Sequence, residues 1–189
     1  MLQSIKLWYK ESSIQIDSSW NVVKLWEICD ILDKKRKPIT QKDRMKWIYP
    51  YYWASWVLDY VADYIFDEDL VLIWEDWAKR WALDNSAFKV SWKVWVNNHA
   101  HVLTFRRKAT QLFIEHYFNY NRIDGYLTGT AQPKLNQDKL NSIPVPNPDE
   151  TTLSTFEGVC QQADKSISEL RKSIDAIDKV IKSLINENL

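Results

Sequence analysis

The stretch LSTFEGVCQQADKSISELRKSIDAIDKVIKSL, residues 153–184, decides the C-terminal architecture of this chain. Apolar residues follow one another along it at alternating steps of three and four, and Lys, Glu, Asp and Ser fill most of the other positions. The seam residues are Leu153, Phe156, Cys160, Ala163, Ile167, Leu170, Ile174, Ile177, Ile181 and Leu184. Sustained over about five heptads, this spacing predicts one long coiled-coil helix whose narrow stripe a second helix must cover.

The length of this predicted helix indicates its role. A helix from Thr151 to Asn188 would measure nearly 60 Å at a rise of about 1.5 Å per residue, which is too long for the core of a compact domain of this size. We therefore interpret it as a spacer or assembly arm that mediates dimerisation and subunit assembly. The alternative is an ordinary amphipathic helix packed on its own domain.

The chain divides by composition into three predicted parts. Its 189 residues suffice for one globular domain plus the arm, and three prolines within residues 144–148 mark the boundary between them. We predict an N-terminal extension at 1–19, a globular domain at 20–148 and the long helix at 149–189.

Composition predicts a folded protein that works in the cytoplasm. The chain is 46% hydrophobic and 26% charged, and no apolar run is long enough to span a bilayer. The start MLQSIKLWYKESS lacks the features of a secretory signal. Because Cys29 and Cys160 fall in different predicted parts, we expect no disulfide framework.

The net charge of zero conceals an asymmetry between the predicted parts. Residues 20–148 hold 18 Lys and Arg against 15 Asp and Glu, whereas residues 149–189 hold 5 against 8. Within the globular part the basic residues are clustered at 34–37, 42–46, 79–80 and 106–108. Such clusters can line one groove for DNA, although short basic runs are also common in solvated loops.

The globular part shows a β-like pattern with flanking helices. Short aromatic and β-branched runs separated by polar turns occur at 49–52, 64–65, 70–73, 88–96 and 99–105. They predict a small, mostly antiparallel sheet in an α+β domain. Helical spacing predicts a helix at 108–121, and a short helix follows with Asn136 as its N-cap.

Motifs for catalysis or metal binding are missing from the sequence. It contains neither a phosphate-binding loop nor a GxGxxG turn, so we expect no nucleotide hydrolysis. His99 and His101 could face one side of a strand, but no further ligand stands nearby at zinc spacing, and we expect structural histidines and no metal. The acidic residues at 67–69 and 75–76 favour an acidic turn over a catalytic carboxylate pair.

Four segments in a fixed order carry a family resemblance. They are WNVVKL, YPYYWASWVLDYVADYIFDEDLVLI, VWVNNHAHVL and YLTGTAQPKLNQDKLNSIPVPNP, and the last leads into the heptad helix. From Trp20 to the C-terminus the chain resembles the specificity subunit of type I restriction-modification enzymes. Such subunits carry two target recognition domains joined by two long helices in an antiparallel coiled coil. This chain has one of each, so it resembles a half-subunit that forms a homodimer; a truncated subunit would look the same.

The resemblance implies a non-enzymatic protein that recognises double-stranded DNA. Methyltransferase subunits that use S-adenosylmethionine, and a restriction or translocase subunit that uses ATP, would be its partners, while this chain itself would hold no cofactor. Basic loops would contact phosphates and polar side chains would read bases in the major groove. The predicted DNA contacts are Lys34, Arg36, Lys37, Arg44, Lys79, Arg80, Arg106 and Arg107, whereas Lys134 and Asn136 would brace the loop that joins domain to arm.

The chain departs from the family pattern in having 11 Trp and only 3 Gly. The resemblance implies glycine at Trp53, Trp56, Trp74, Trp77 and Trp92, and also at Trp26, Trp47 and Trp81, whereas Trp20 and Trp95 fit the pattern. Either turn glycines have been exchanged for tryptophan in an altered sequence, or a natural lineage uses these aromatics for stacking. A bulky side chain at a turn glycine costs about 1–3 kcal/mol of strain.

A different class of function stays open beside DNA recognition. The chain could be a non-enzymatic coiled-coil interaction protein whose aromatic-rich domain binds another protein or single-stranded nucleic acid. Exposed aromatics interleaved with Lys and Arg are typical of single-strand binding. Binding to duplex DNA should weaken steeply as salt rises, whereas an aromatic protein contact should barely change.

Overall fold

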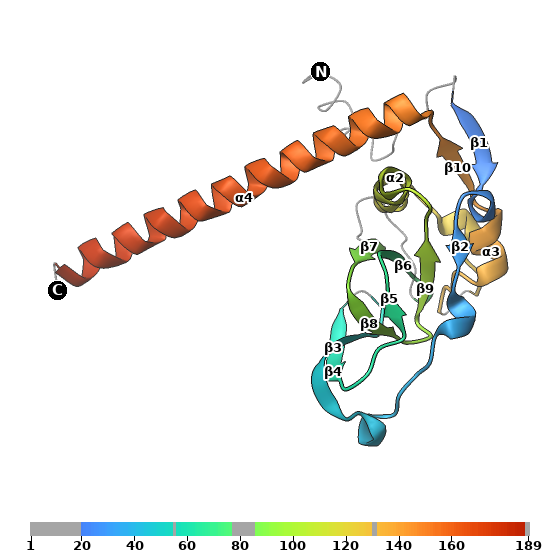
Figure 1. The fold of residues 1–189 in the computed structure, drawn as a ribbon, viewed down its shortest axis with the longest axis horizontal. Coiled ribbons are helices and arrows are strands. Elements are labelled where there is room, and N and C mark those ends of the chain that lie inside the picture. Colours follow the sequence, from blue (N-terminus) through green and yellow to red (C-terminus); the bar gives the residue numbers. More distant parts are fainter. Residues whose placement is uncertain (1–19, 55, 77–85, 130–131, 188–189) are drawn as a thin grey trace. The chain divides into compact units, whose positions relative to one another are not determined.

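The computed structural model describes residues 20–54, 56–76, 86–129 and 132–187 (Figure 1). The predictions made for residues 1–19, Lys79, Arg80, Trp77 and Trp81 lie outside these ranges. The chain forms two units, one ending at Asp149 and the other beginning at Glu150, and each is described by itself.

The first sheet has the strand order β2-β9-β6-β7 and is antiparallel throughout. Its strands are β2 (Asp30–Ile31), β6 (Leu70–Trp74), β7 (Ala87–Val90) and β9 (Ala100–Thr104). The apolar run Leu70–Ile73 is fully buried, because β6 lies between β9 and β7 inside the domain. Val71 pairs with Leu103 on one side and with Lys89 on the other.

The second sheet has the order β4-β3-β8-β5. It consists of β3 (Lys46–Tyr52), β4 (Val57–Val61), β5 (Phe66–Asp67) and β8 (Lys93–Val96), and only β3 and β8 pair in parallel, with Tyr51 opposite Trp95. Side chains from both sheets, including Phe66, Leu72 and Val94, share one buried cluster. The prediction of a mostly antiparallel sheet is therefore confirmed.

The single run predicted at residues 88–96 is in fact two strands, one in each sheet. The chain turns between β7 and β8 at Ser91 and Trp92. Trp92 has a φ of 71°, in the left-handed region that favours glycine, and its indole is 53% exposed. This conformation fits the family expectation of glycine at position 92.

Helices and a short ribbon complete the first unit. Helix α2 (Lys108–Tyr120), at the predicted position, buries Phe113, Ile114 and Phe118. Helix α3 (Gln137–Ser142) has the predicted N-cap, because the Lys139 backbone N–H donates to Asn136 Oδ1 at 3.0 Å. The 3-10 turns are η1 (Leu25–Glu27), η2 (Asp33–Lys35), η3 (Gln41–Asp43) and η4 (Asp124–Tyr126).

The proline-rich segment also forms a strand. Strand β1 (Asn21–Lys24) pairs antiparallel with β10 (Pro144–Asn147), so that Val23 lies opposite Val145. Both strands of this two-stranded ribbon are edge strands. Proline is tolerated in an edge strand because the backbone groups on its outer side form no hydrogen bonds to another strand.

The second unit is one helix, α4 (Glu150–Glu187), of 38 residues. It confirms the long C-terminal helix predicted from the heptads, and with it the α+β class. The C-terminal half of the seam is exposed: Ile167, Leu170, Ile174, Ile177, Ile181 and Leu184 are 48–63% accessible.

Candidate nucleic-acid interface

A buried carboxylate organises the start of the basic segment. Asp33 opens η2, and its Oδ1 accepts a hydrogen bond from the Val102 backbone N–H at 2.9 Å. Its Oδ2 lies 2.5 Å from His101 Nδ1 and 3.3 Å from Arg36 Nη2. His101 in turn contacts the Leu135 carbonyl through Nε2 at 2.5 Å. Asp33 therefore joins η2, β9 and the loop before α3, and His101 has the structural role expected for it.

Arg36 faces this network. Its Nη1 donates to Glu75 Oε2 at 2.8 Å and to the Ala100 carbonyl at 2.7 Å, and only 13% of its side chain is accessible. A guanidinium held in this way has little freedom to contact a phosphate. We assign Arg36 to bracing the loop and leave it out of the proposed DNA contacts.

Arg44 is held in a similar way on the far side of the loop. Its Nε donates to the Ile39 carbonyl at 3.3 Å, its Nη1 lies 3.8 Å from Asp59, and its guanidinium stacks 4.9 Å over the ring centre of Tyr51. These contacts leave 15% of the side chain accessible. Arg44 therefore also supports the loop, and little of its side chain faces solvent.

The remaining cations of this segment point to solvent. We call residues 34–46 the basic loop, and its exposed lysines are Lys34, Lys35, Lys37, Lys42 and Lys46. The loop is fastened at its middle, because the Lys37 backbone N–H donates to Val96 and the Lys37 carbonyl accepts from Trp95 Nε1 at 2.6 Å. Two inward arginines thus support a loop that exposes five lysines, and exposed lysines are among the side chains that contact a phosphate backbone.

The basic loop leads into an exposed apolar surface on the β3–β4 hairpin. We call this surface the hairpin end; its residues are Met45, Trp47, Ile48, Leu58 and Tyr60, which are 41–74% accessible. A cavity of about 350 Å³ lies beside it, lined by residues that include Lys37, Met45 and Trp95. These residues were not among the predicted contacts, although Leu58 and Tyr60 alternate with less exposed residues in VLDYV and so show the period of a strand.

Arg106 and Arg107 lie elsewhere in the domain. Thr104 pairs with Asp30 at one end of the β2–β9 ladder, whereas the basic loop continues from the other end. The predicted DNA contacts therefore do not form one group. Lys34 and Lys37 stand together on the basic loop, Arg106 and Arg107 are exposed before α2, and Lys79 and Arg80 lie outside the described residues.

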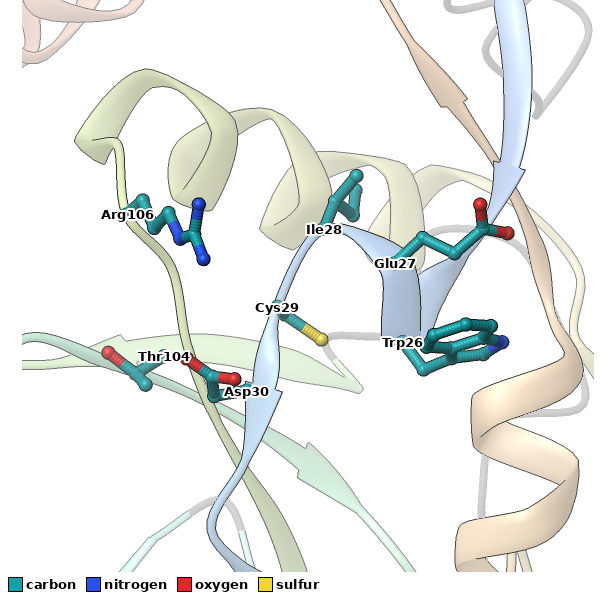
Figure 2. A pocket seen from close by; sticks show the side chains of 7 residues that line it. All are labelled: Trp26, Glu27, Ile28, Cys29, Asp30, Thr104 and Arg106. Atoms are coloured by element: carbon teal, nitrogen blue, oxygen red, sulfur yellow. The ribbon is translucent and has the colours of Figure 1, made fainter.

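Arg106 lines a polar pocket of about 250 Å³ (Figure 2). Figure 2 shows Arg106 and Trp26 at two sides of the pocket with the Cys29 thiol between them. The Cys29 Sγ donates to the Leu25 carbonyl at 3.3 Å, and burial together with the neighbouring Asp30 raises the pKa of the thiol to about 12. The thiol stays protonated at neutral pH, so Cys29 is not a nucleophile there.

The loop of the GTAQPKLN motif is tied to the first sheet. Lys134 Nζ lies 2.6 Å from Asp76 Oδ1, and Asp76 also contacts His99 Nδ1. Burial alone would raise the pKa of Asp76, but the hydrogen bonds from Lys134 and His99 outweigh it and hold that pKa below its usual value. The expectation that Lys134 and Asn136 brace this loop is met by these contacts and by the cap of α3.

Tryptophans expected to be glycines gather around His99. The rings of Trp53 and Trp56 lie 4.8 Å apart, Trp53 lies 4.9 Å from His99, and Trp56 lies 6.5 Å from Trp74. Trp92 contacts Tyr49 at 5.5 Å. These rings mostly contact other aromatics near the surface and do not fill the buried cluster shared by the sheets.

Comparison with known families decides the relationship. The sequence model of the family described as "Type I restriction modification DNA specificity domain" matches residues 17–187. The chain belongs to this family. It is 34% identical over 125 residues to a putative type I restriction enzyme specificity subunit of Haemophilus influenzae, an alignment that covers 65% of this chain and 31% of that protein.

Solved structures of type I specificity subunits share the fold. The chain is similar to the specificity subunit from M. genitalium (TM-score 0.57, 10% identity, 84% of this chain and 43% of that one). It is also similar to the HsdS subunit from Thermoanaerobacter tengcongensis (TM-score 0.53, 14% identity, 91% and 49%). A third structure concerns complex assembly and conformational transition of a type I restriction-modification system. It gives a TM-score of 0.59 at 12% identity, and the match covers 96% of this chain and 47% of that one. The chain therefore spans less than half the length of these relatives.

Two further observations concern the described part of the chain only. No helix there combines the length and apolarity needed to cross a membrane. No group of three or more His, Cys, Asp or Glu side chains in these ranges is arranged to hold a metal ion.

Proposed function

We propose that this chain is the DNA-recognition half-subunit of a type I restriction-modification complex and that it binds duplex DNA through the basic loop. The observation that carries the proposal is the family match over residues 17–187, joined to a loop whose arginines are fixed inward and whose lysines face solvent. Fixed cations bind phosphates at a low entropic cost because their supporting backbone is already ordered.

Recognition would divide between two kinds of contact. Lys34, Lys37 and the other exposed lysines of the loop would hold phosphates and set the register on the duplex, while side chains of the adjoining hairpin end would approach the bases. Arg106 and Arg107 would add a second phosphate contact at the start of α2. Arg36 and Arg44 would act through the loop that they support.

Catalysis would belong to other subunits. The chain would work without a cofactor, would not be an enzyme, and would place methyltransferase subunits that use S-adenosylmethionine on the target. A restriction or translocase subunit that uses ATP would join through the complex. Support comes from the family and from the relatives' names, which describe specificity subunits of type I enzymes.

Two copies of the chain would make one complete recognition unit. The exposed apolar seam of α4 needs a partner helix, and a second copy of the chain would supply one. A two-fold pair would read two identical half-sites in inverted orientation, because the symmetry of the protein is imposed on its site.

Salt dependence of DNA binding tests this proposal. The chain is assembled with the methyltransferase subunits of its own system, and retention of duplex DNA is measured at several salt concentrations. We expect a steep loss of affinity with salt, and a shallower slope for the Lys34→Glu/Lys37→Glu variant because fewer phosphates are neutralised. Lys139→Glu, an exposed change on α3, is the matched control. No retention by the assembled complex, or equal slopes for all three proteins, would count against the proposal.

The hairpin end supports a second candidate, a protein-interaction module. Several large apolar side chains exposed in one hairpin are typical of a segment that binds another protein. Under this alternative, binding would change little with salt and would be lost on Trp47→Ser/Tyr60→Ser, while Lys34→Glu/Lys37→Glu would have no effect.

A further inference from the structure

The long helix carries apolar side chains outside its seam. In the heptad of α4, Val159, Ser166, Ser173 and Val180 occupy one flank of the seam at intervals of seven residues. Both valines are exposed, at 47% and 59%. Thr152 and Glu187 continue this flank toward the two ends of α4, and its four inner positions, valine, serine, serine and valine, have the same order in either direction along the helix.

The opposite flank carries charge. It holds Glu157, Asp164, Arg171 and Asp178, followed by Ile185. In an antiparallel pair of helices each flank faces the same flank of the other helix, whereas in a parallel pair each flank faces the opposite one. Each combination of helix direction and register thus brings a different set of flank residues together, and these sets can be compared.

We propose that α4 binds α4 of a second copy of this chain, antiparallel and in full overlap, with the two-fold axis between Ser168 and Glu169. This inference rests on the proposed half-subunit function and specifies its dimer. In this register the exposed Ile167 lies opposite the second copy's Leu170. The small Cys160 and Ala163 lie opposite the larger Ile177 and Ile174.

Both flanks support the same axis. Val159 covers the second copy's Val180, Ser166 lies beside Ser173, and Asp164 lies beside Arg171 with the opposite charge. Every one of these contacts occurs twice because the pair is symmetric. Glu157 beside Asp178, which also occurs twice, is unfavourable and offsets the Asp164–Arg171 contact. The charged flank therefore favours this axis only because other registers bring more like charges together, and apolar burial on the seam contributes more than these exposed pairs.

Neighbouring registers fit less well. Sliding the helices by one heptad toward their C-terminal ends puts Arg171 beside Arg171 and Asp164 beside Asp178. Sliding them the other way brings Arg171 beside Glu157 with opposite charge, but it puts Asp164 beside Asp164 and Glu150, the first residue of the charged flank, beside Asp178. It also leaves Ile181 and Leu184 beyond the start of the other α4 at Glu150. A parallel pair places Val159 beside Asp164. Of the registers compared, only full overlap both places the two exposed valines beside each other and puts every exposed seam residue opposite a seam residue of the other copy.

The register fixes a distance that matters for recognition. In full overlap the two copies of Glu150 lie about 56 Å apart along the coiled coil, at about 1.5 Å per residue. A slip of one heptad would change this distance by about 10 Å, which corresponds to about three base pairs at 3.4 Å each.

Cysteine cross-linking distinguishes the registers. Cys29→Ala/Cys160→Ala removes the native thiols, and Ser166→Cys and Ser173→Cys are introduced into separate, differently tagged chains that are expressed alone or together. We expect an oxidised dimer only from co-expression. Cross-linking of Ser166→Cys with itself, or of Ser173→Cys with itself, would show a slipped register. No cross-link in any combination would also overturn the proposal.

A charge exchange tests the same register with the native cysteines in place. Asp164→Arg and Arg171→Asp are each expected to raise the dissociation constant of the dimer several-fold, and the double variant to restore it. Lys172→Asp, on the face away from the seam, is the control and should leave it unchanged. Failure of the double variant to recover affinity would overturn the pairing. If the complex still retains DNA in a salt-sensitive way, the register fails while the proposed function stands.

Discussion

His101 and Asp33, 68 residues apart in sequence, lie with Nδ1 2.5 Å from Oδ2 in the interior of the recognition domain. Both side chains are almost fully buried, and Arg36 shares the same carboxylate. One acidic group therefore fixes both the base of the basic loop and the central strand β9. A family motif, the second histidine of VNNHAHVL, thus has a supporting role in the domain.

Removing the Asp33 carboxylate should destabilise the domain. Asp33→Ala leaves His101 Nδ1 and the Val102 backbone N–H without their buried acceptor and removes one of the two carboxylates that hold Arg36. Losing one partner of a buried charged network costs about 3 kcal/mol or more. The free energy of unfolding, measured with urea, checks this value. Asp30→Ala, at an exposed position of the preceding strand β2, is the control. A loss of less than about 1 kcal/mol for Asp33→Ala would contradict the role of the network.

Glycine at position 92 should stabilise the chain. A tryptophan at a φ of 71° is strained, and relief of this strain is expected to contribute about 1 kcal/mol, reduced by the lost contact with Tyr49. The informative comparison is with Trp92→Ala, which also removes the indole but keeps the Cβ atom. Thermal unfolding should rank Trp92→Gly above Trp92→Ala. The reverse order would mean that the turn carries no strain.

The contact between Asp76 and Lys134 predicts a pH dependence of stability. Folding lowers the pKa of Asp76 below the value of 3.8 that we take for the unfolded chain. The Asp76 carboxylate therefore stabilises the fold at every pH above 3.8, and this contribution is lost as the pH falls through the lower pKa of the folded state. Lys134 is 49% accessible, so solvent screening limits the effect of Asp76→Asn to about 1 kcal/mol at pH 7. Urea unfolding at pH 7 and below pH 4 should show the difference shrinking. In a Lys134→Met background the effect at pH 7 should be smaller; an unchanged effect would exclude this ion pair as its cause.

The Cys29 thiol should react slowly. Its pKa of about 12 leaves almost no thiolate at pH 8, and its Sγ–H is engaged with the Leu25 carbonyl. In a Cys160→Ala variant, modification by iodoacetamide should be much slower in the native protein than in urea. Equal rates would show that the pocket beside Arg106 does not protect the thiol.

The elements with strong local signals were predictable from the sequence. The heptads gave α4, the helical spacing gave α2, and Asn136 gave the cap of α3. By contrast, β1 and β10 pair across more than a hundred residues, and prolines in PVPN argue locally against a strand. The division of residues 88–96 depends on the turn at Trp92, where the glycine that signals a turn is missing.

The candidate site was predictable only in part. The basic clusters were visible, but sequence cannot show which cations face inward, because the partners of Arg36 are the residue directly after β6 and the first residue of β9, 39 and 64 residues away. Asp33 was missed for the same reason. An isolated acidic residue before a basic run has no local pattern that indicates burial.

Methylation mapping tests the central claim most directly. The chain is combined with the methyltransferase subunits of its own system, S-adenosylmethionine and a DNA library, and methylated adenines are located by sequencing, with a reaction lacking the chain as control. The account predicts methylation at one bipartite site made of two identical, inverted half-sites, and none without the chain. Methylation that is independent of the chain, or scattered without a common sequence, would contradict it.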